Sequence, residues 1–124
     1  MRVKNIKLGV RSLDTAFAEW AETFEKVRQG KKAAKSQGIY FTSLEAMRRV
    51  LTEKRLELLH VIKEQHPDSV YQLAKMVKRD IKNISDDLEM LENIGLVSMA
   101  KTRKGRKQVT PRVNYDKIQL EIGV

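Results

Sequence analysis

Two neighbouring segments of opposite charge carry the residue types best suited to binding and reading a nucleic acid. Residues 82–97, KNISDDLEMLENIGLV, have one lysine and four carboxylates, whereas residues 101–107, KTRKGRK, have five basic side chains. Lysine and arginine neutralise phosphate, asparagine can pair with adenine, and a carboxylate can accept a hydrogen bond from the cytosine amine. Because phosphate contacts position a protein and base contacts specify the site, the basic segment could supply affinity and the acidic one specificity.

A helix that follows Asp80 would present the base-reading side chains. We expect Asp80 to cap this helix and Gly95 to close it. Its apolar, inward face would consist of Ile81, Ile84, Leu88 and Leu91. The outward face of its first two turns would meet the major groove and consists of Lys82, Asn83, Asp86 and Glu89. The full set of predicted residues for binding double-stranded DNA is Lys78, Arg79, Lys82, Asn83, Ser85, Asp86, Lys101, Arg103, Lys104, Arg106 and Lys107.

Simpler interpretations of the same charges stay open. Asp80, Asp86 and Asp87 lie near the helix start, where each carboxylate could complement the positive helix end by a few tenths to about 1 kcal/mol. The basic segment could be a solvated, charged loop. Under these interpretations neither segment would need a partner.

Metal and covalent chemistry have little support in the sequence. The absence of cysteine excludes disulfides, thiolate metal sites and a cysteine nucleophile, and His60 and His66 lie six residues apart with no nearby cysteine. No phosphate-binding loop, GxSxG elbow or HExxH helix occurs. We therefore expect no catalytic residues, no metal and no cofactor, and we expect that the protein is not an enzyme.

Length and charge limit the organisation of the chain. Its 124 residues with 41% hydrophobic content suit one small domain with an appended arm. The net charge of +9 favours an anionic partner, with nucleic acid ahead of an acidic protein or a lipid surface. No apolar run approaches the roughly 18 residues of a membrane span, and the N-terminus lacks the apolar core of a signal peptide. We expect a cytoplasmic protein without membrane contact.

Residues 1–37 are predicted to form an arm. Ile6, Leu8 and Val10 alternate with polar residues, which indicates a short strand, and Ser12 could cap the helix that follows. That helix is amphipathic, and its apolar stripe, a predicted dimer or partner interface, consists of Leu13, Phe17, Trp20, Phe24 and Val27. Residues 28–38 contain two glycines and four basic side chains, which predicts a linker.

Residues 38–124 are predicted to form a compact domain. A short strand at GIYF precedes three capped helices in which Thr42, Thr52 and Ser69 are the expected N-caps, and Pro67 ends the second of them. After the helix that ends at Gly95, the apolar period changes from 3.6 to 2, which predicts a β-hairpin with a basic tip. Its second strand contains Pro111 and should lie at an edge or carry a bulge. A last possible strand contains Ile118, Leu120 and Ile122.

This order of helices followed by a hairpin is that of a winged helix-turn-helix, a mainly α fold with a small β wing (α+β). The segment SVYQLAKMVKRDIKNISDDLEMLENIGLV resembles the DNA-binding core of MarR- and ArsR-type regulators, including their "LE..GL" phrase at the end of the recognition helix. The longer segment GIYFTSLEAMRRVLTEKRLELLHVI resembles a smaller group of winged-helix regulators, some of them beside RelE-type toxin genes. The resemblance implies DNA binding, as an autoregulator. The joint between the two helices reads KRD where the MarR/ArsR-type family often has glycine, and Asp86 stands at a recognition-helix position that arginine often holds in that family.

Two function classes follow. The leading one is a sequence-specific regulator of transcription, a repressor or autoregulator, that binds double-stranded DNA as a homodimer. The alternative is an antitoxin-type interaction module that grips a toxin protein through the N-terminal helix. The surface that is required distinguishes them: the basic wing and the Asp80 helix for DNA, or the aromatic stripe of the arm for protein.

Overall fold

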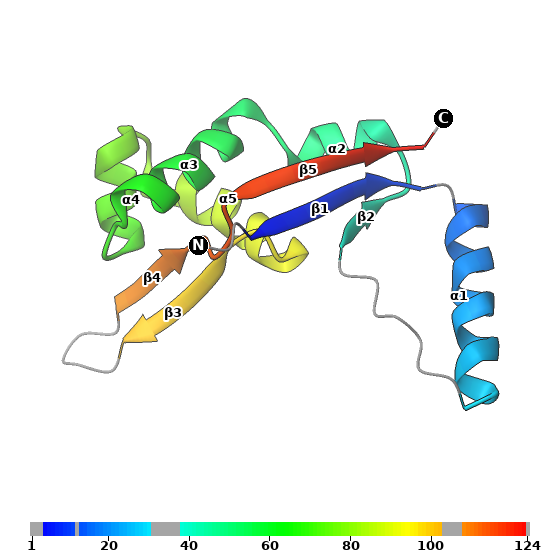
Figure 1. The fold of residues 1–124 in the computed structure, drawn as a ribbon. Helices are drawn as coiled ribbons and strands as arrows, with labels where there is room; N and C mark the ends of the chain where they lie inside the picture. The colour runs from blue at the N-terminus through cyan, green and yellow to red at the C-terminus, as the bar shows by residue number, and fades with distance from the viewer. Residues whose placement is uncertain (1–3, 12, 31–37, 103–107, 124) are drawn as a thin grey trace.

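Short sequence signals set most of the elements of the fold. The computed structural model describes residues 4–11, 13–30, 38–102 and 108–123. Within them the chain forms five helices and five strands, so the fold is α+β (Figure 1). In chain order the elements are β1 (Asn5–Val10), α1 (Leu13–Arg28), β2 (Ile39–Phe41), α2 (Leu44–Val50), α3 (Glu53–Gln65), α4 (Val70–Val77), α5 (Ile81–Ile94), β3 (Ser98–Thr102), β4 (Gln108–Arg112) and β5 (Lys117–Ile122).

Three of the predicted helix caps are confirmed. The Thr52 hydroxyl accepts a hydrogen bond from the Arg55 backbone N–H at 3.2 Å at the start of α3, and the Ser69 hydroxyl accepts one from Gln72 N–H at 3.0 Å at the start of α4. Each bond satisfies a backbone donor that the first helical turn leaves unpaired. Gly95 ends α5 with a φ of 90°, a left-handed conformation that glycine adopts without a Cβ penalty.

Other boundary predictions need correction. Thr42 does not cap α2, because the extended backbone continues one residue further and the Ser43 hydroxyl accepts from Ala46 N–H at 3.1 Å. Asp80 occupies the N-cap position of α5, but its side chain makes no capping hydrogen bond. Ile81 is exposed rather than turned inward, because the buried face of α5 begins one turn later.

A three-stranded parallel sheet joins the two ends of the chain. β1 lies between β2 and β5, and Leu8 pairs with Ile39 on one side and Leu120 on the other. At the start of β1, the Asp116 carboxylate accepts from the Lys4 backbone N–H at 2.8 Å and pairs with the Lys63 ammonium of α3 at 3.1 Å. The Lys4 N–H and the Lys63 ammonium hold the pKa of the Asp116 carboxyl below its ordinary value.

The hydrophobic core lies between this sheet and helices α3, α4 and α5. Leu8 contributes from β1, and the other fully buried leucine and isoleucine side chains are Leu58, Ile62, Leu73, Ile84, Leu88, Leu91 and Leu96. Their helical members recur at three- or four-residue spacing, so each helix turns one apolar stripe to the same interior. This core fixes the orientation of α5 relative to α3 and α4.

The N-terminal helix and the hairpin project from this body. Figure 1 shows α1 set apart from the other helices, beyond the end of β1, while β3 and β4 form an antiparallel pair on another side of the molecule. The predicted strands and the hairpin are confirmed, and Pro111 lies in β4, which pairs with β3 in a two-stranded sheet. The boundary between an arm (residues 1–37) and a domain (residues 38–124) stays a prediction. β1 lies before this boundary but is part of the same sheet as β2 and β5, which lie after it.

Candidate nucleic-acid interface

The joint between α4 and α5 contains the first basic residues of the predicted interface. α4 ends at Val77, and the C-cap residue that follows, Lys78, adopts a left-handed backbone with φ 56° and ψ 47°. Its N–H donates to the carbonyl oxygen of Lys75 at 3.3 Å, and Arg79 N–H donates to that of Ala74 at 3.1 Å. This conformation costs a non-glycine residue about 1–2 kcal/mol, so the KRD joint makes the tight turn at a strain that glycine would avoid. The Lys78 side chain is exposed at this turn.

α5 separates an apolar face from a polar one, as its spacing predicts. Ile84, Leu88 and Leu91 are at most 2% exposed. The exposed side chains of its first three turns include Lys82, Asn83, Ser85, Asp86 and Glu89. The exposed face therefore offers an ammonium, an amide, a hydroxyl and carboxylates to a partner, a set that can both donate hydrogen bonds to base edges and accept them.

Asp87 has a different role from its exposed neighbour Asp86. Its carboxylate accepts from the Arg55 guanidinium Nε of α3 at 3.1 Å and from the Arg79 Nη2 at 2.8 Å, and the three side chains are between 15% and 23% exposed. Arg55 Nη1 also donates to the carbonyl oxygens of Arg49 and Val50 at 2.8 and 2.9 Å. This cluster ties α5 to α3 and to the end of α2, so Asp87 does more than complement the start of its own helix.

The cluster includes one residue that was predicted to contact DNA and one that the sequence did not reveal. Arg79 was predicted to contact DNA, and its guanidinium lies against Asp87, with Nη1 buried and without a hydrogen-bond partner in the described part of the chain. Its contact with phosphate stays a prediction. Arg55 was not identified from the sequence, because a contact between residues 32 positions apart leaves no local spacing signal.

One hydrogen bond joins the hairpin to the helical body, and a second joins the two segments that flank the hairpin. The Thr110 hydroxyl donates to the carbonyl oxygen of Asp68 in the α3–α4 loop at 2.7 Å, and the Tyr115 hydroxyl donates to the carbonyl oxygen of Leu96 at 2.8 Å. Burial raises the pKa of Tyr115 to about 12, because the phenolate would lose solvation. These bonds set the hairpin beside the end of α5 and the start of α4.

The basic residues of the hairpin fall partly outside the described region. Lys101 is exposed on β3, where it pairs in register with Val109 of β4. The remaining predicted wing residues, Arg103, Lys104, Arg106 and Lys107, lie outside the residues that the structure describes. Their contacts with DNA stay predictions, and the described strands place the two ends of this segment next to each other at Thr102 and Gln108.

The aromatic stripe of α1 is exposed. Phe17 and Trp20 are each 66% exposed and Phe24 is 57% exposed, and the rings of Trp20 and Phe24 stack with centroids 5.6 Å apart. An ion pair between Arg11 and Glu19 connects the end of β1 with α1. The side chains of Leu13 and Val27, the other predicted members of the stripe, lie outside the described set.

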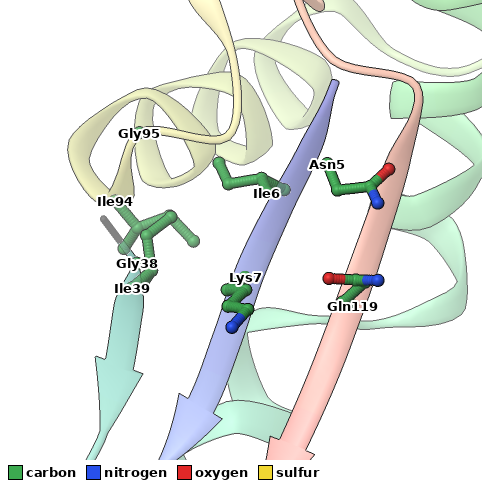
Figure 2. Close-up of a pocket in the computed structure, with 8 residues that line it drawn as sticks. All are labelled: Asn5, Ile6, Lys7, Gly38, Ile39, Ile94, Gly95 and Gln119. Atoms are coloured by element: carbon green, nitrogen blue, oxygen red, sulfur yellow. The ribbon is translucent and has the colours of Figure 1, made fainter. Parts of the chain in front are cut away.

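A surface hollow of about 610 Å³ is lined by residues of β1, β2 and β5 and by the C-terminal end of α5 (Figure 2). Ile6, Ile39 and Ile94 form its apolar part, whereas Asn5, Lys7 and Gln119 come from the neighbouring strands β1 and β5. Its described lining contains no carboxylate or imidazole for acid–base chemistry. Among the described residues, no group of three or more His, Cys, Asp or Glu side chains could hold a metal ion.

The architecture is α+β and compatible with a winged-helix-like fold: three consecutive helices are followed by an antiparallel hairpin. The model of the HVO_A0114 family matches residues 50–120, and the chain therefore belongs to that family. The matched region includes α3, α4, α5, the hairpin and most of β5. The resemblance to MarR- and ArsR-type regulators stays a prediction.

Two further comparisons add little to this assignment. Among solved structures, the chain is similar to ScpB from Mycobacterium tuberculosis at 16% identity and a TM-score of 0.42, over 85% of this chain and 81% of that one. A search of curated proteins gives no match. None of the described helices is long and apolar enough to cross a membrane.

Proposed function

We propose that the protein is a sequence-specific regulator of transcription that binds double-stranded DNA, as a repressor or autoregulator, without catalytic activity. The observation that carries this proposal is that one face of α5 is fixed against the protein while the other is exposed. Its apolar face and Asp87 are held by the body of the protein, whereas Lys82, Asn83 and Asp86 are exposed on its first turns. A helix that is held in this way can enter a major groove with its outer side chains in a fixed orientation.

The acidic character of α5 is compatible with this function. One of its carboxylates, Asp87, neutralises arginines within the protein. In the proposed complex, Asp86 accepts from a cytosine amine and Asn83 pairs with adenine, while Lys82 contacts the edge of the groove. Affinity comes from phosphate contacts by Lys78, by Lys101 and by the basic segment of the hairpin.

The specificity of α5 is tested by selecting binding sites from a random duplex library. Asn83→Ala and Asp86→Ala should each change the preferred bases at one or two positions, at about 1–3 kcal/mol per lost base contact. Asn93→Ala is the matched control, because Asn93 is exposed on the same helix but about 15 Å further along it. Identical selected sites for wild type, both variants and the control would contradict direct reading by α5.

The contribution of the hairpin is tested by the salt dependence of binding. Replacing Arg103, Lys104, Arg106 and Lys107 with alanine should flatten the slope of log affinity against log salt by roughly 0.9 per lost phosphate contact, up to about 3.6. Replacing four exposed basic residues of α1, α2 and α3, Lys26, Arg48, Arg49 and Lys54, removes the same charge and should leave the slope nearly unchanged. Equal slopes for the two quadruple variants would remove the wing from the mechanism.

The exposed stripe of α1 favours a second candidate, an antitoxin-type module that binds a toxin protein. The two candidates differ in what they require of the Trp20 surface when the chain is alone. A module of this kind would need its partner to cover Trp20, and DNA binding would be secondary.

A further inference from the structure

α1 has an apolar face whose three aromatic side chains are left uncovered by the residues that the structure describes. The three aromatic side chains of that face are more than half exposed. An isolated helix of 16 residues is marginally stable in water, and most helices in proteins are stabilised by packing of an apolar face. A stripe with three exposed aromatic rings is therefore expected to pack against another surface.

The spacing of the stripe matches another helix better than a broad protein surface. Leu13, Phe17, Trp20, Phe24 and Val27 follow one another at intervals of four, three, four and three residues. This is the a/d pattern of a coiled coil over two heptads, with Phe17 and Phe24 at a and Trp20 at d. Such a stripe is narrower than the apolar face of a helix that packs on a globular core.

The charges of α1 complement those of a second α1 in the opposite direction. Asp14 and Arg28 both occupy e positions, at the two ends of the helix, and both are exposed. In an antiparallel pair the e positions face each other, so Asp14 of each copy lies beside Arg28 of the other. Ala21, the middle e position, lies next to its own counterpart, and its small side chain leaves room for the Trp20 rings. Antiparallel helix dipoles also attract.

We propose that α1 pairs with α1 of a second copy of this chain, as an antiparallel, two-fold coiled coil along the Phe17–Trp20–Phe24 stripe. The interface is isologous, because the same surface is used by both copies. Trp20 of one copy then packs against Phe24 of the other, which adds inter-chain stacking to the stack within each helix.

The size of the seam indicates a dimer of moderate strength. Three aromatic side chains of about 150–250 Å² each, exposed by 57–66%, would bury on the order of 300–500 Å² per copy. The total of about 600–1,000 Å² lies below the 1,200–2,000 Å² of most stable interfaces. Self-association should therefore depend on protein concentration in the micromolar range and above. If the proposed function holds, two half-sites on one duplex would strengthen it.

Self-association is measured without DNA, so the result does not depend on the proposed function. Trp20 is the one tryptophan of the sequence, so tryptophan emission reports directly on the seam. Raising the concentration should shift that emission to shorter wavelength, in step with dimer formation in sedimentation equilibrium. A chain that stays monomeric, with unchanged emission, at several hundred micromolar would overturn the proposal.

The orientation is tested by disulfide cross-linking, because the chain has no cysteine of its own. Ala21→Cys should form a disulfide-linked dimer rapidly on oxidation, and a mixture of Asp14→Cys and Arg28→Cys proteins should give the mixed dimer. Glu22→Cys is the control: position 22 is adjacent in sequence but faces away from the seam, so it should cross-link slowly. Equal rates for positions 21 and 22, or Asp14→Cys proteins that link to one another faster than to Arg28→Cys, would overturn the antiparallel pairing.

Charge exchange gives an independent test that keeps the aromatic seam intact. Asp14→Lys or Arg28→Glu should each weaken dimerisation by about fivefold, because two exposed pairs are lost per dimer. The double variant should recover most of the wild-type affinity. Failure of this recovery would contradict the Asp14–Arg28 contact. A different protein that covers Trp20, while the free chain stays monomeric, would assign the stripe to that protein and overturn self-pairing.

Discussion

Asp87→Ala should destabilise the protein far more than the same change at the adjacent Asp86. Asp87 accepts two charge-assisted hydrogen bonds, from Arg55 at 3.1 Å and from Arg79 at 2.8 Å. Hydrogen bonds to charged groups contribute about 1.5–3 kcal/mol each, which gives about 3–6 kcal/mol for the two. Asp86 is exposed, and truncation of an exposed surface side chain typically changes the free energy of unfolding by at most about 0.5 kcal/mol.

Solvent access sets the expected value near the lower end of that range. The three side chains of the cluster are 15–23% exposed, so water can replace part of each lost bond. The two guanidinium groups that remain would repel each other without the carboxylate between them. Removal of one partner of a buried ion pair costs about 3–5 kcal/mol, and we expect a loss of about 3 kcal/mol for Asp87→Ala.

The measurement is urea denaturation of wild type, Asp87→Ala and Asp86→Ala, followed by circular dichroism. A lower midpoint with an unchanged slope m identifies a change in stability rather than in the compactness of the unfolded state. Asp87→Asn should fall between wild type and Asp87→Ala, because an amide oxygen can still accept from one arginine. If Asp87→Ala and Asp86→Ala lower the free energy of unfolding by the same amount, the cluster does not stabilise α5 as described.

Three further predictions concern other parts of the fold. Gly9→Ala should cost about 1–3 kcal/mol, because a Cβ at this position would lie 2.6 Å from the Tyr40 ring, whereas Gly123→Ala meets no neighbour within 4 Å and should be neutral in the same denaturation assay. The pKa of Tyr115, raised to about 12, predicts that stability is complete below pH 10 and declines between pH 10 and 12, as the unfolded phenol ionises first. Denaturation midpoints across this range should fall more steeply for wild type than for Tyr115→Phe. The lowered pKa of Asp116 predicts a contribution that is present above the ordinary carboxyl pKa and lost as pH falls below it, so acid titration should affect wild type more than Asp116→Asn.

Local signals allowed much of the secondary structure to be predicted. The hydroxyls of Thr52 and Ser69 and the glycine at position 95 act on backbone groups within a few residues, so their effects can be recognised in the sequence itself. The change of apolar period after Gly95 likewise predicted the hairpin. Where two adjacent residues could cap the same helix, the sequence did not distinguish Thr42 from Ser43, because both side chains offer a hydroxyl.

The same logic placed the exposed face of α5, because three buried residues at helical spacing determine which residues must face away from them. It could not separate Asp86 from Asp87, which differ by one position on that helix. Only the approach of α3 decides that Asp87 meets Arg55 while Asp86 is exposed.

By itself, the sequence determined the helices, the hairpin, the excess of positive charge and the aromatic stripe of α1, because each follows from residue type and short-range spacing. The tertiary structure decided which distant residues meet. β1 pairs in parallel with β5, more than 100 residues away, and Asp116 binds the start of β1 through the Lys4 backbone. Parallel strands and ion pairs between helices form where the core brings their elements together, and no periodicity in either segment specifies the partner.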